Sequence, residues 1–168
     1  MEFYDVVKSR KSIRAYKDEP IDPDALRRIG EAVNLAPSAC NIQPWCFRII
    51  LNREVRNSIS SCYKNEWLKK APAIVVALGN KDAAWKRLDG DSIINVDIGI
   101  AMEHLVLAAA AEGLGTCWIC AYDVGRMNSV LGILPPWEVI AISPLGKAAE
   151  NPEPRKRKPI SEVFRIIE

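Results

Sequence analysis

Two clusters of basic residues, one near each end of the chain, are the features most able to do chemistry. The first has the sequence SRKSIRAY and covers residues 9–16, so that three cations and two serine hydroxyls lie close together. The second is Arg155-Lys156-Arg157-Lys158. Guanidinium groups hold phosphate oxygens through paired hydrogen bonds, whereas a lysine offers a point charge. The two clusters therefore predict an anion site, with a solvated helix face and a free tail as the alternative for either cluster alone.

The usual backbone devices for binding phosphate are absent from the sequence. No Gly-x-Gly-x-x-Gly follows a predicted strand, and no Gly-Lys-Ser/Thr loop occurs. Any phosphate must therefore be held by side chains. The single histidine, His104, lies inside an apolar stretch, where we expect a buried or interfacial hydrogen-bonding residue and not a general base. This argues against Ser-His and Cys-His nucleophilic catalysis.

Cys117 and Cys120 have the spacing of a redox dithiol, which gives the chain an alternative function. In thioredoxin-like motifs this pair begins a helix, whose dipole lowers the pKa of the first thiol. Here residues 116–119 are predicted to form a strand, so we expect two cysteines on opposite sides of a buried strand end. A zinc site would need Cys40 and Cys46 to join them across a long separation, and no metal centre is expected.

The composition is that of an ordinary globular protein, and a formal net charge of +2 gives no reason to expect nucleic-acid binding. The 168 residues contain no repeat or low-complexity linker, which predicts one domain over residues 1–168. The longest apolar stretch, residues 96–111, carries charged interruptions and is shorter than the roughly 20 residues of a membrane span. The N-terminus lacks the pattern of a signal peptide. We therefore expect a cytoplasmic protein with reduced cysteines and no membrane partner.

Hydrophobic periodicity and capping signals predict a mixture of helices and strands that must position these residues. Asp22 followed by Pro23 marks one helix start, and Asp123 marks another. The expected helices are a short opening helix carrying Phe3, Val6 and Val7, then residues 22–36, 53–70 with an internal break, 93–112 and 123–131. The expected strands are residues 45–51, 73–78, 116–119 and 139–143. These elements predict an α+β sandwich in which a mostly antiparallel sheet of four to five strands is flanked by helices.

Three irregular segments are expected to carry the functional side chains. In residues 12–16, Ser12, Arg14 and Tyr16 alternate with Ile13 and Ala15, which predicts an extended segment that puts Ser12 and Arg14 on one side. The loop of residues 37–44 holds two prolines and several polar side chains directly before a strand, and is expected to be a site loop. After Gly146, the prolines at positions 152 and 154 predict an extended C-terminal arm, which carries the second basic cluster.

Four segments, in chain order, resemble the signatures of the FMN-dependent nitroreductases. The first is SRKSIRAY (residues 9–16) and the second is APSACNIQPW (residues 36–45). The third runs from DIGIA (residues 97–101) to GLGTCWI (residues 113–119), and the fourth is RKRKP (residues 155–159). The resemblance covers nearly the whole chain. It implies a nitroreductase-like fold and a homodimer that holds two FMN molecules at its interface, each contacted by both subunits.

The resemblance also assigns roles by position. The phosphate and the pyrimidine end of the flavin would be held by residues of one subunit: Arg10, Lys11, Ser12, Arg14, Arg155 and Arg157. The ring would be lined by residues of the other subunit: Pro37, Ser38, Ala39, Asn41 and Gln43. The turn beside the reactive flavin N5, where a backbone N–H can donate, would be Trp118, Ile119, Cys120 and Ala121. A further ring contact is implied near residues 63–65.

The implied activity is a ping-pong reaction in which NADH or NADPH reduces FMN, leaves, and is replaced by an acceptor such as a nitroaromatic, a quinone or a flavin. A fixed cation, for which Arg14 is the candidate, would stabilise the negative charge that reduced flavin gains at N1 and O2. No catalytic side-chain acid or base is implied. A flavin-binding module without turnover stays open as a third function. Cys120 departs from relatives that have glycine there, and the short connection over residues 80–92 implies an open site.

Overall fold

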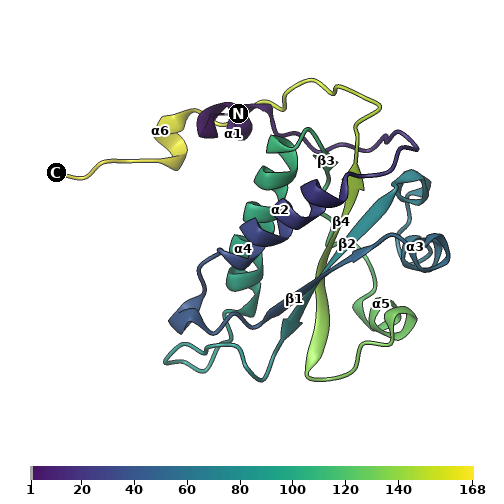
Figure 1. Ribbon diagram of the computed structural model, residues 1–168. Coiled ribbons are helices and arrows are strands. Elements are labelled where there is room, and N and C mark those ends of the chain that lie inside the picture. The colour runs from purple at the N-terminus through teal and green to yellow at the C-terminus, as the bar shows by residue number, and fades with distance from the viewer. Residues whose placement is uncertain (1) are drawn as a thin grey trace.

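A four-stranded antiparallel sheet forms the centre of the computed structural model, which describes residues 2–168 (Figure 1). The strand order is β1-β2-β4-β3, and every neighbouring pair is antiparallel. The strands are β1 (Trp45–Ile50), β2 (Ala73–Asn80), β3 (Gly115–Thr116) and β4 (Trp137–Gly146). The helices are α1 (Phe3–Ser9), α2 (Pro23–Asn34), α3 (Arg53–Ser60), α4 (Ile94–Ala111), α5 (Val124–Leu131) and α6 (Ile160–Val163). The predicted α+β class and antiparallel sheet are confirmed.

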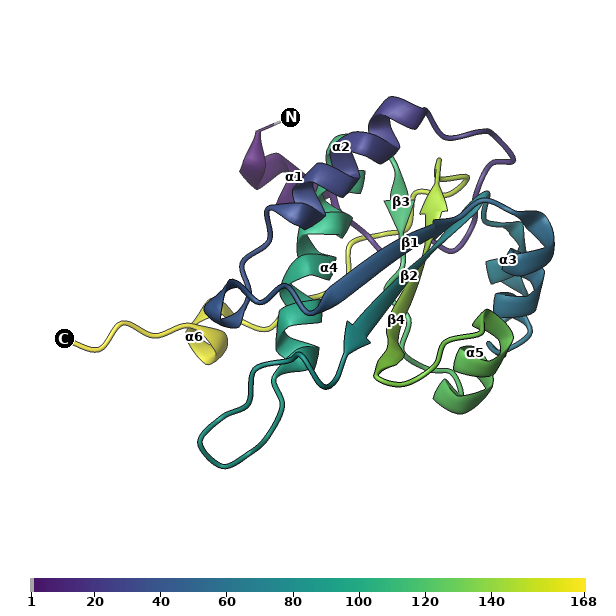
Figure 2. The same cartoon turned by 60° about the horizontal axis from the view of Figure 1, so that its bottom comes forward.

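The sheet is covered on both faces, and Figure 2 shows α2 and α4 on one side with α3 and α5 on the other. Strand β2 alternates between these layers. Val75 packs with the α2 and α4 side chains, whereas Ile74 and Val76 pack with α3 and α5. A strand buried on both faces requires an unbroken apolar sequence, which explains why residues 73–78 carry no polar side chain.

Side-chain caps define where several helices begin. Asp22 Oδ1 accepts a hydrogen bond from the Asp24 N–H at 3.0 Å, and Asp123 Oδ1 accepts one from the Arg126 N–H at 2.7 Å, as their sequence positions predict. The helix predicted over residues 53–70 is broken: α3 ends at Ser60, and a 3₁₀ helix, η2, covers Glu66–Lys70.

The extended segment predicted over residues 12–16 is not a regular strand. Only Ser12 and Tyr16 form bridges, to Thr116 and Ala148 respectively. Tyr16 is buried and its hydroxyl donates to the Ile13 carbonyl at 2.6 Å, whereas Ser12 is half-buried and Arg14 is exposed. Strict alternation holds only in a continuous strand, and the backbone between these two bridges is irregular. The strand predicted over residues 116–119 is likewise shortened to β3, followed by one bridge at Ile119.

Helix α4 is largely apolar, although only part of its surface is covered and the exposed Glu103 interrupts its open side. By length and composition it could cross a membrane, but it is 44% buried and packs against α2 and the sheet as a core helix does. Val96 stays 51% exposed, and Gly99 and Leu107 on the same stripe are half-buried. The stripe therefore marks a surface that this single chain leaves partly uncovered.

Candidate functional site

The first basic cluster lies on a segment, residues 10–17, that we call the strap. Its backbone is fixed by the Ile13 N–H, which donates to the Thr116 carbonyl at 2.8 Å, and by the Lys17 N–H, which donates to the Lys147 carbonyl at 2.9 Å. The Ala149 N–H donates back to the Ala15 carbonyl at 2.9 Å. The strap therefore lies between β3 and the chain that leaves β4, which gives its side chains a fixed origin.

Glu150 clamps the strap, a role that the sequence did not indicate. Its Oε1 accepts from the backbone N–H of Arg14 at 2.5 Å and from that of Ala15 at 3.2 Å. Lys11 Nζ donates to Asn151 Oδ1 at 3.0 Å beside it. The start of the C-terminal arm thus holds the strap backbone while the Arg14 guanidinium stays exposed.

The strap and the C-terminal arm together line a cavity of about 630 Å³, which we call the arginine cavity. It brings together six of the residues singled out in the sequence: Arg10, Lys11, Ser12, Arg14, Arg155 and Arg157. Within residues 2–168 none of these four arginines forms an ion pair, and the acidic lining residue is Glu153. Guanidinium groups without carboxylate partners favour a bound anion.

The loop of residues 37–44 has an unusual backbone. Cys40, Asn41 and Gln43 have φ values of 48°, 54° and 53°, in the left-handed region that non-glycine residues rarely adopt. The Ser38 hydroxyl accepts from the Gln43 N–H at 2.9 Å and closes the loop on itself. Backbone strain of this kind is concentrated at functional sites, which agrees with a site loop.

The loop and the arginine cavity lie at opposite ends of α4 (Figure 1). The N-terminal end of α4 contacts the loop, because Asp97 Oδ1 accepts from the Ala39 N–H at 3.1 Å. The other end lies near the strap, since Ala110 and Gly113 line a small cavity with Lys11. The 18 residues of α4 span about 27 Å. The structure therefore brings the two basic clusters together but places residues 37–43 elsewhere.

The turn over residues 118–121 follows β3 and is partly open to solvent. Ile119 is buried and exchanges two backbone hydrogen bonds with Ile142, at 2.9 and 3.0 Å. Trp118, Cys120 and Ala121 are exposed. The Trp118 indole lies over Gly99 on α4, where an added Cβ would be 3.9 Å from the ring. This turn therefore contacts the same helix that contacts the loop.

The two cysteines of the candidate dithiol differ in environment. Cys117 is buried, and burial raises the pKa of its thiol, while nearby Arg14 and Ser12 act in the opposite direction. Cys120 is exposed, and α5 begins only at Val124. A redox dithiol needs a thiolate at low pKa and a helix start, so the structure gives little support to that function.

Two other predicted positions have structural roles. The His104 Nδ1 lies 3.0 Å from the Ala32 carbonyl and ties α4 to α2, in agreement with the expected hydrogen-bonding role. Residues 63–65 connect α3 to η2, and the Tyr63 ring meets Trp67 edge-on at 5.7 Å.

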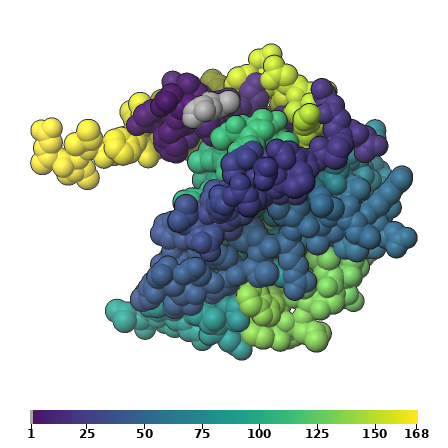
Figure 3. All heavy atoms as spheres, in the orientation of Figure 1, coloured from purple at the N-terminus to yellow at the C-terminus, as the bar shows by residue number. Residues whose placement is uncertain are grey.

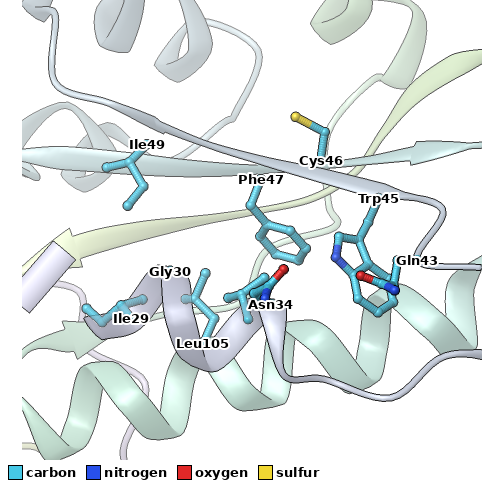
Figure 4. Close-up of a pocket in the computed structure, with 10 residues that line it drawn as sticks. Ile29, Gly30, Asn34, Gln43, Trp45, Cys46, Phe47, Ile49 and Leu105 are labelled. Atoms are coloured by element: carbon cyan, nitrogen blue, oxygen red, sulfur yellow. The ribbon is translucent and has the colours of Figure 1, made fainter. Parts of the chain in front are cut away.

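A second cavity, of about 340 Å³, runs between α2 and β1, and we call it the edge groove (Figure 4). Trp45, Phe47 and Ile49 point from β1 into the groove toward α2 and Leu105 of α4, whereas Cys46 points away (Figure 4). Strand β1 is the outer strand of the sheet and pairs only with β2 within residues 2–168. The groove therefore has mainly apolar side chains, with Asn34 and Gln43 beside them, and is bordered by the unpaired edge of β1.

Comparisons with known proteins agree with this architecture. The family model described as "Putative TM nitroreductase" matches residues 2–168. A relative from Methanothermobacter thermautotrophicus, named "Putative NADH dehydrogenase/NAD(P)H nitroreductase", is 30% identical over 163 residues, covering 92% of this chain and 82% of the relative. A nitroreductase family protein from Clostridium difficile 630 superposes with a TM-score of 0.91 at 27% identity, covering 98% of each chain. An FMN-dependent nitroreductase from Clostridium difficile R20291 gives a TM-score of 0.78 at 27% identity, covering 94% of this chain and 92% of that one. On its sequence match over residues 2–168 and its shared architecture, this chain belongs to the nitroreductase family.

Proposed function

We propose that this chain is an FMN-dependent oxidoreductase that takes electrons from NADH or NADPH and passes them to a nitroaromatic, a quinone or a flavin. The observation that carries the proposal is the arginine cavity, where Arg10, Arg14, Arg155 and Arg157 meet without ion-pair partners among residues 2–168. The FMN-dependent relative and the NAD(P)H nitroreductase relative support the choice of cofactor and reductant.

The residues present fit FMN. A phosphomonoester carries about 1.5 to 2 negative charges at neutral pH, which matches a cavity lined by several guanidinium groups and the Ser12 hydroxyl. Arg10, Ser12, Arg155 and Arg157 would hold the phosphate. FMN, when bound, supplies hydride and electron transfer at its N5. Arg14 would stabilise negative charge on the ring by electrostatics, and the exposed residues of the turn, Trp118, Cys120 and Ala121, would present backbone N–H groups to it.

We further propose that the active form is a homodimer. Residues 37–43 and the arginine cavity lie at opposite ends of α4, so one chain cannot place both on the same flavin. A second copy could supply the loop to the cavity of the first. The exposed stripe of α4, with Val96 at 51% exposure, would then be covered by its symmetry mate.

The C-terminal arm provides a second surface for dimerisation. It stands away from the body (Figure 3) and exposes five large apolar side chains: Ile160, Val163, Phe164, Ile166 and Ile167. The edge groove offers apolar side chains and the free edge of β1, to which an extended segment can add as a strand. We place the partner's arm in this groove. A variant that lacks residues 160–168 should sediment as a monomer, and a truncated chain that is still dimeric would contradict this arrangement.

The function is tested with purified protein. The as-purified protein should be yellow, release FMN on denaturation, and lose its flavin absorbance when mixed anaerobically with NADH or NADPH in a stopped-flow instrument. A colourless protein that cannot be reconstituted with FMN would exclude the proposed cofactor. If FMN is bound but neither NADH nor NADPH reduces its absorbance, the chain would be a flavin-binding module without reductase activity.

A further inference from the structure

Asp97 is the buried one of two acidic residues in the largely apolar helix α4, the other being the exposed Glu103. Its side chain is 1% exposed, and its Oδ1 accepts from the Ala39 N–H at 3.1 Å. Within residues 2–168 its Oδ2 has no hydrogen-bond partner. A carboxylate buried with an unsatisfied oxygen is costly, so a protein that retains one gains something else from it. Asp97 lies in the first turn of α4, where the helix dipole favours negative charge and lowers that cost.

The group that Asp97 holds is the strained loop of residues 37–44. Three non-glycine residues of this loop have positive φ values, a conformation that persists only where the surroundings enforce it. The bonds from Gln43 to Ser38 and Asn41 are internal to the loop. At its C-terminal end the loop is also tied to β2, where the Asn80 N–H donates to the Pro44 carbonyl at 2.9 Å. For residues 38–43, which include all three left-handed residues, the bond to Asp97 is the one hydrogen bond in the described structure that reaches beyond residue 45.

The same turn of α4 also positions the other proposed flavin-ring segment. Gly99, two residues after Asp97, lies under the Trp118 indole, which belongs to the turn of residues 118–121. Val96, the residue directly before Asp97, is part of the exposed stripe of α4. One turn of α4 therefore contacts the loop through Asp97, the turn through Gly99, and solvent through Val96.

We propose that Asp97 is a positioning residue that fixes the loop of residues 37–44 in its left-handed form and sets its place relative to residues 118–121. The loop geometry stands on the contacts above, whereas its effect on flavin rests on the proposed function. The unsatisfied Oδ2 is the cost of this tether on residues 38–43. Loss of the tether should release the loop and weaken FMN binding without changing the fold.

The tether can be removed from either side. Asp97→Ala removes the acceptor. Ala39→Pro removes the N–H donor and leaves the core intact, because Ala39 is the first residue of a 3₁₀ turn, where proline is favoured, and Ser38 already has the extended backbone that precedes proline. The matched control is Asn128→Ala, since Asn128 Oδ1 likewise accepts a backbone N–H, that of Val139 at 2.9 Å, on the far face of the sheet.

We expect each tether variant to raise the Kd for FMN by about 10- to 100-fold and to change the visible circular dichroism of bound flavin, whereas Asn128→Ala does neither. The double variant should bind FMN no more weakly than the single variant with the higher Kd, because both substitutions remove the same hydrogen bond. Asp97→Asn keeps an acceptor oxygen and should recover part of the affinity. Additive effects, or an Ala39→Pro protein with wild-type Kd and circular dichroism, would overturn the proposal.

Hydrogen exchange in the flavin-free protein separates this inference from the proposed function. In Asp97→Ala and Ala39→Pro, the amides of residues 40–43 should exchange at least about tenfold faster than in wild type, with the amides of β2 unchanged. Unchanged exchange in the loop would refute the positioning role even if the protein binds FMN. A wild-type protein that binds no FMN would refute the proposed function, and the exchange data would still decide the role of Asp97.

Discussion

Gly115 sets how closely the strap approaches β3, and its replacement by alanine gives a direct test of that packing. An added Cβ would lie 2.7 Å from Ile13 Cγ1 and 2.9 Å from Ile13 Cβ. Ordinary carbon contacts begin at about 3.5 Å, so one side must move by roughly 0.8 Å. Ile13 is buried and β-branched, and its N–H is bound to the Thr116 carbonyl at 2.8 Å, which leaves it little freedom to adjust.

We expect Gly115→Ala to lower the free energy of unfolding by about 2 kcal/mol, within the range for overpacked cores. For a chain of this length that corresponds to a fall in Tm of about 4–8 °C. The strap would also move Ser12 and Arg14, so the Kd for FMN should rise about tenfold. Urea unfolding followed by tryptophan fluorescence, and titration of the flavin-free protein with FMN, measure the two effects.

The control is Gly125→Ala in α5, where the added Cβ would meet only Asp123 Oδ1 at 3.5 Å. That variant should be as stable as wild type or more stable by about 0.4–1 kcal/mol, because alanine restricts the unfolded chain. A Gly115→Ala protein that unfolds and binds FMN as wild type does would show that the strap is not held by this contact.

Three further predictions follow from particular side chains. Arg14→Ala should raise the Kd for FMN at least about tenfold, whereas Arg53→Ala, an equal change of charge at the start of α3, should stay within about twofold; equal effects would refute the role of the strap. Replacement of both Cys117 and Cys120 by serine should leave NAD(P)H-dependent reduction intact. In the wild-type protein, a maleimide should label Cys120 in the native state and Cys117 only after unfolding, because Cys117 is buried and burial raises the pKa of its thiol. Arg28 donates to Glu112 at 2.8 and 2.7 Å and lowers the pKa of that carboxyl, so the pair stabilises the fold above the ordinary carboxyl pKa and the gain is lost as pH falls through the lowered value. The Tm difference between wild type and Glu112→Gln should therefore be present at pH 7 and should shrink as the pH falls below the ordinary carboxyl pKa of about 4.3.

The elements that the sequence predicted well are those specified by local signals. The Asp22 and Asp123 caps, the apolar run of β2 and the long apolar stretch of α4 each lie within one short window, and their bounds in the structure differ from the predicted ones by a few residues at most. A break in the helix over residues 53–70 was predicted, but its position between α3 and η2 was not, because residues 61–65 contain neither glycine nor proline.

The features that escaped prediction depend on contacts between distant segments. The burial of Tyr16 follows from its bridge to Ala148, and the clamp by Glu150 joins residues far apart in the chain. The left-handed backbone of Cys40, Asn41 and Gln43 could not be predicted, because none of these residues is the glycine that usually indicates a positive φ. Asp97 was visible as an acid in a largely apolar stretch. Glu103 lies in the same helix and is exposed, so the sequence alone does not tell which of the two acids is buried.

The central claim is that each FMN site is built from the strap of one subunit and the loop of its partner. Heterodimers that combine an Arg10→Ala/Arg14→Ala chain with an Asn41→Ala/Gln43→Ala chain test it directly, using pairs whose homodimers have lost FMN. If the sites are shared, one FMN site of the heterodimer combines the altered strap with the altered loop, and the other combines a wild-type strap with a wild-type loop. We predict one FMN for each heterodimer, measured by flavin release after separation on two different affinity tags. Heterodimers that bind no FMN would contradict the shared site, because each chain would then carry a complete but damaged site of its own.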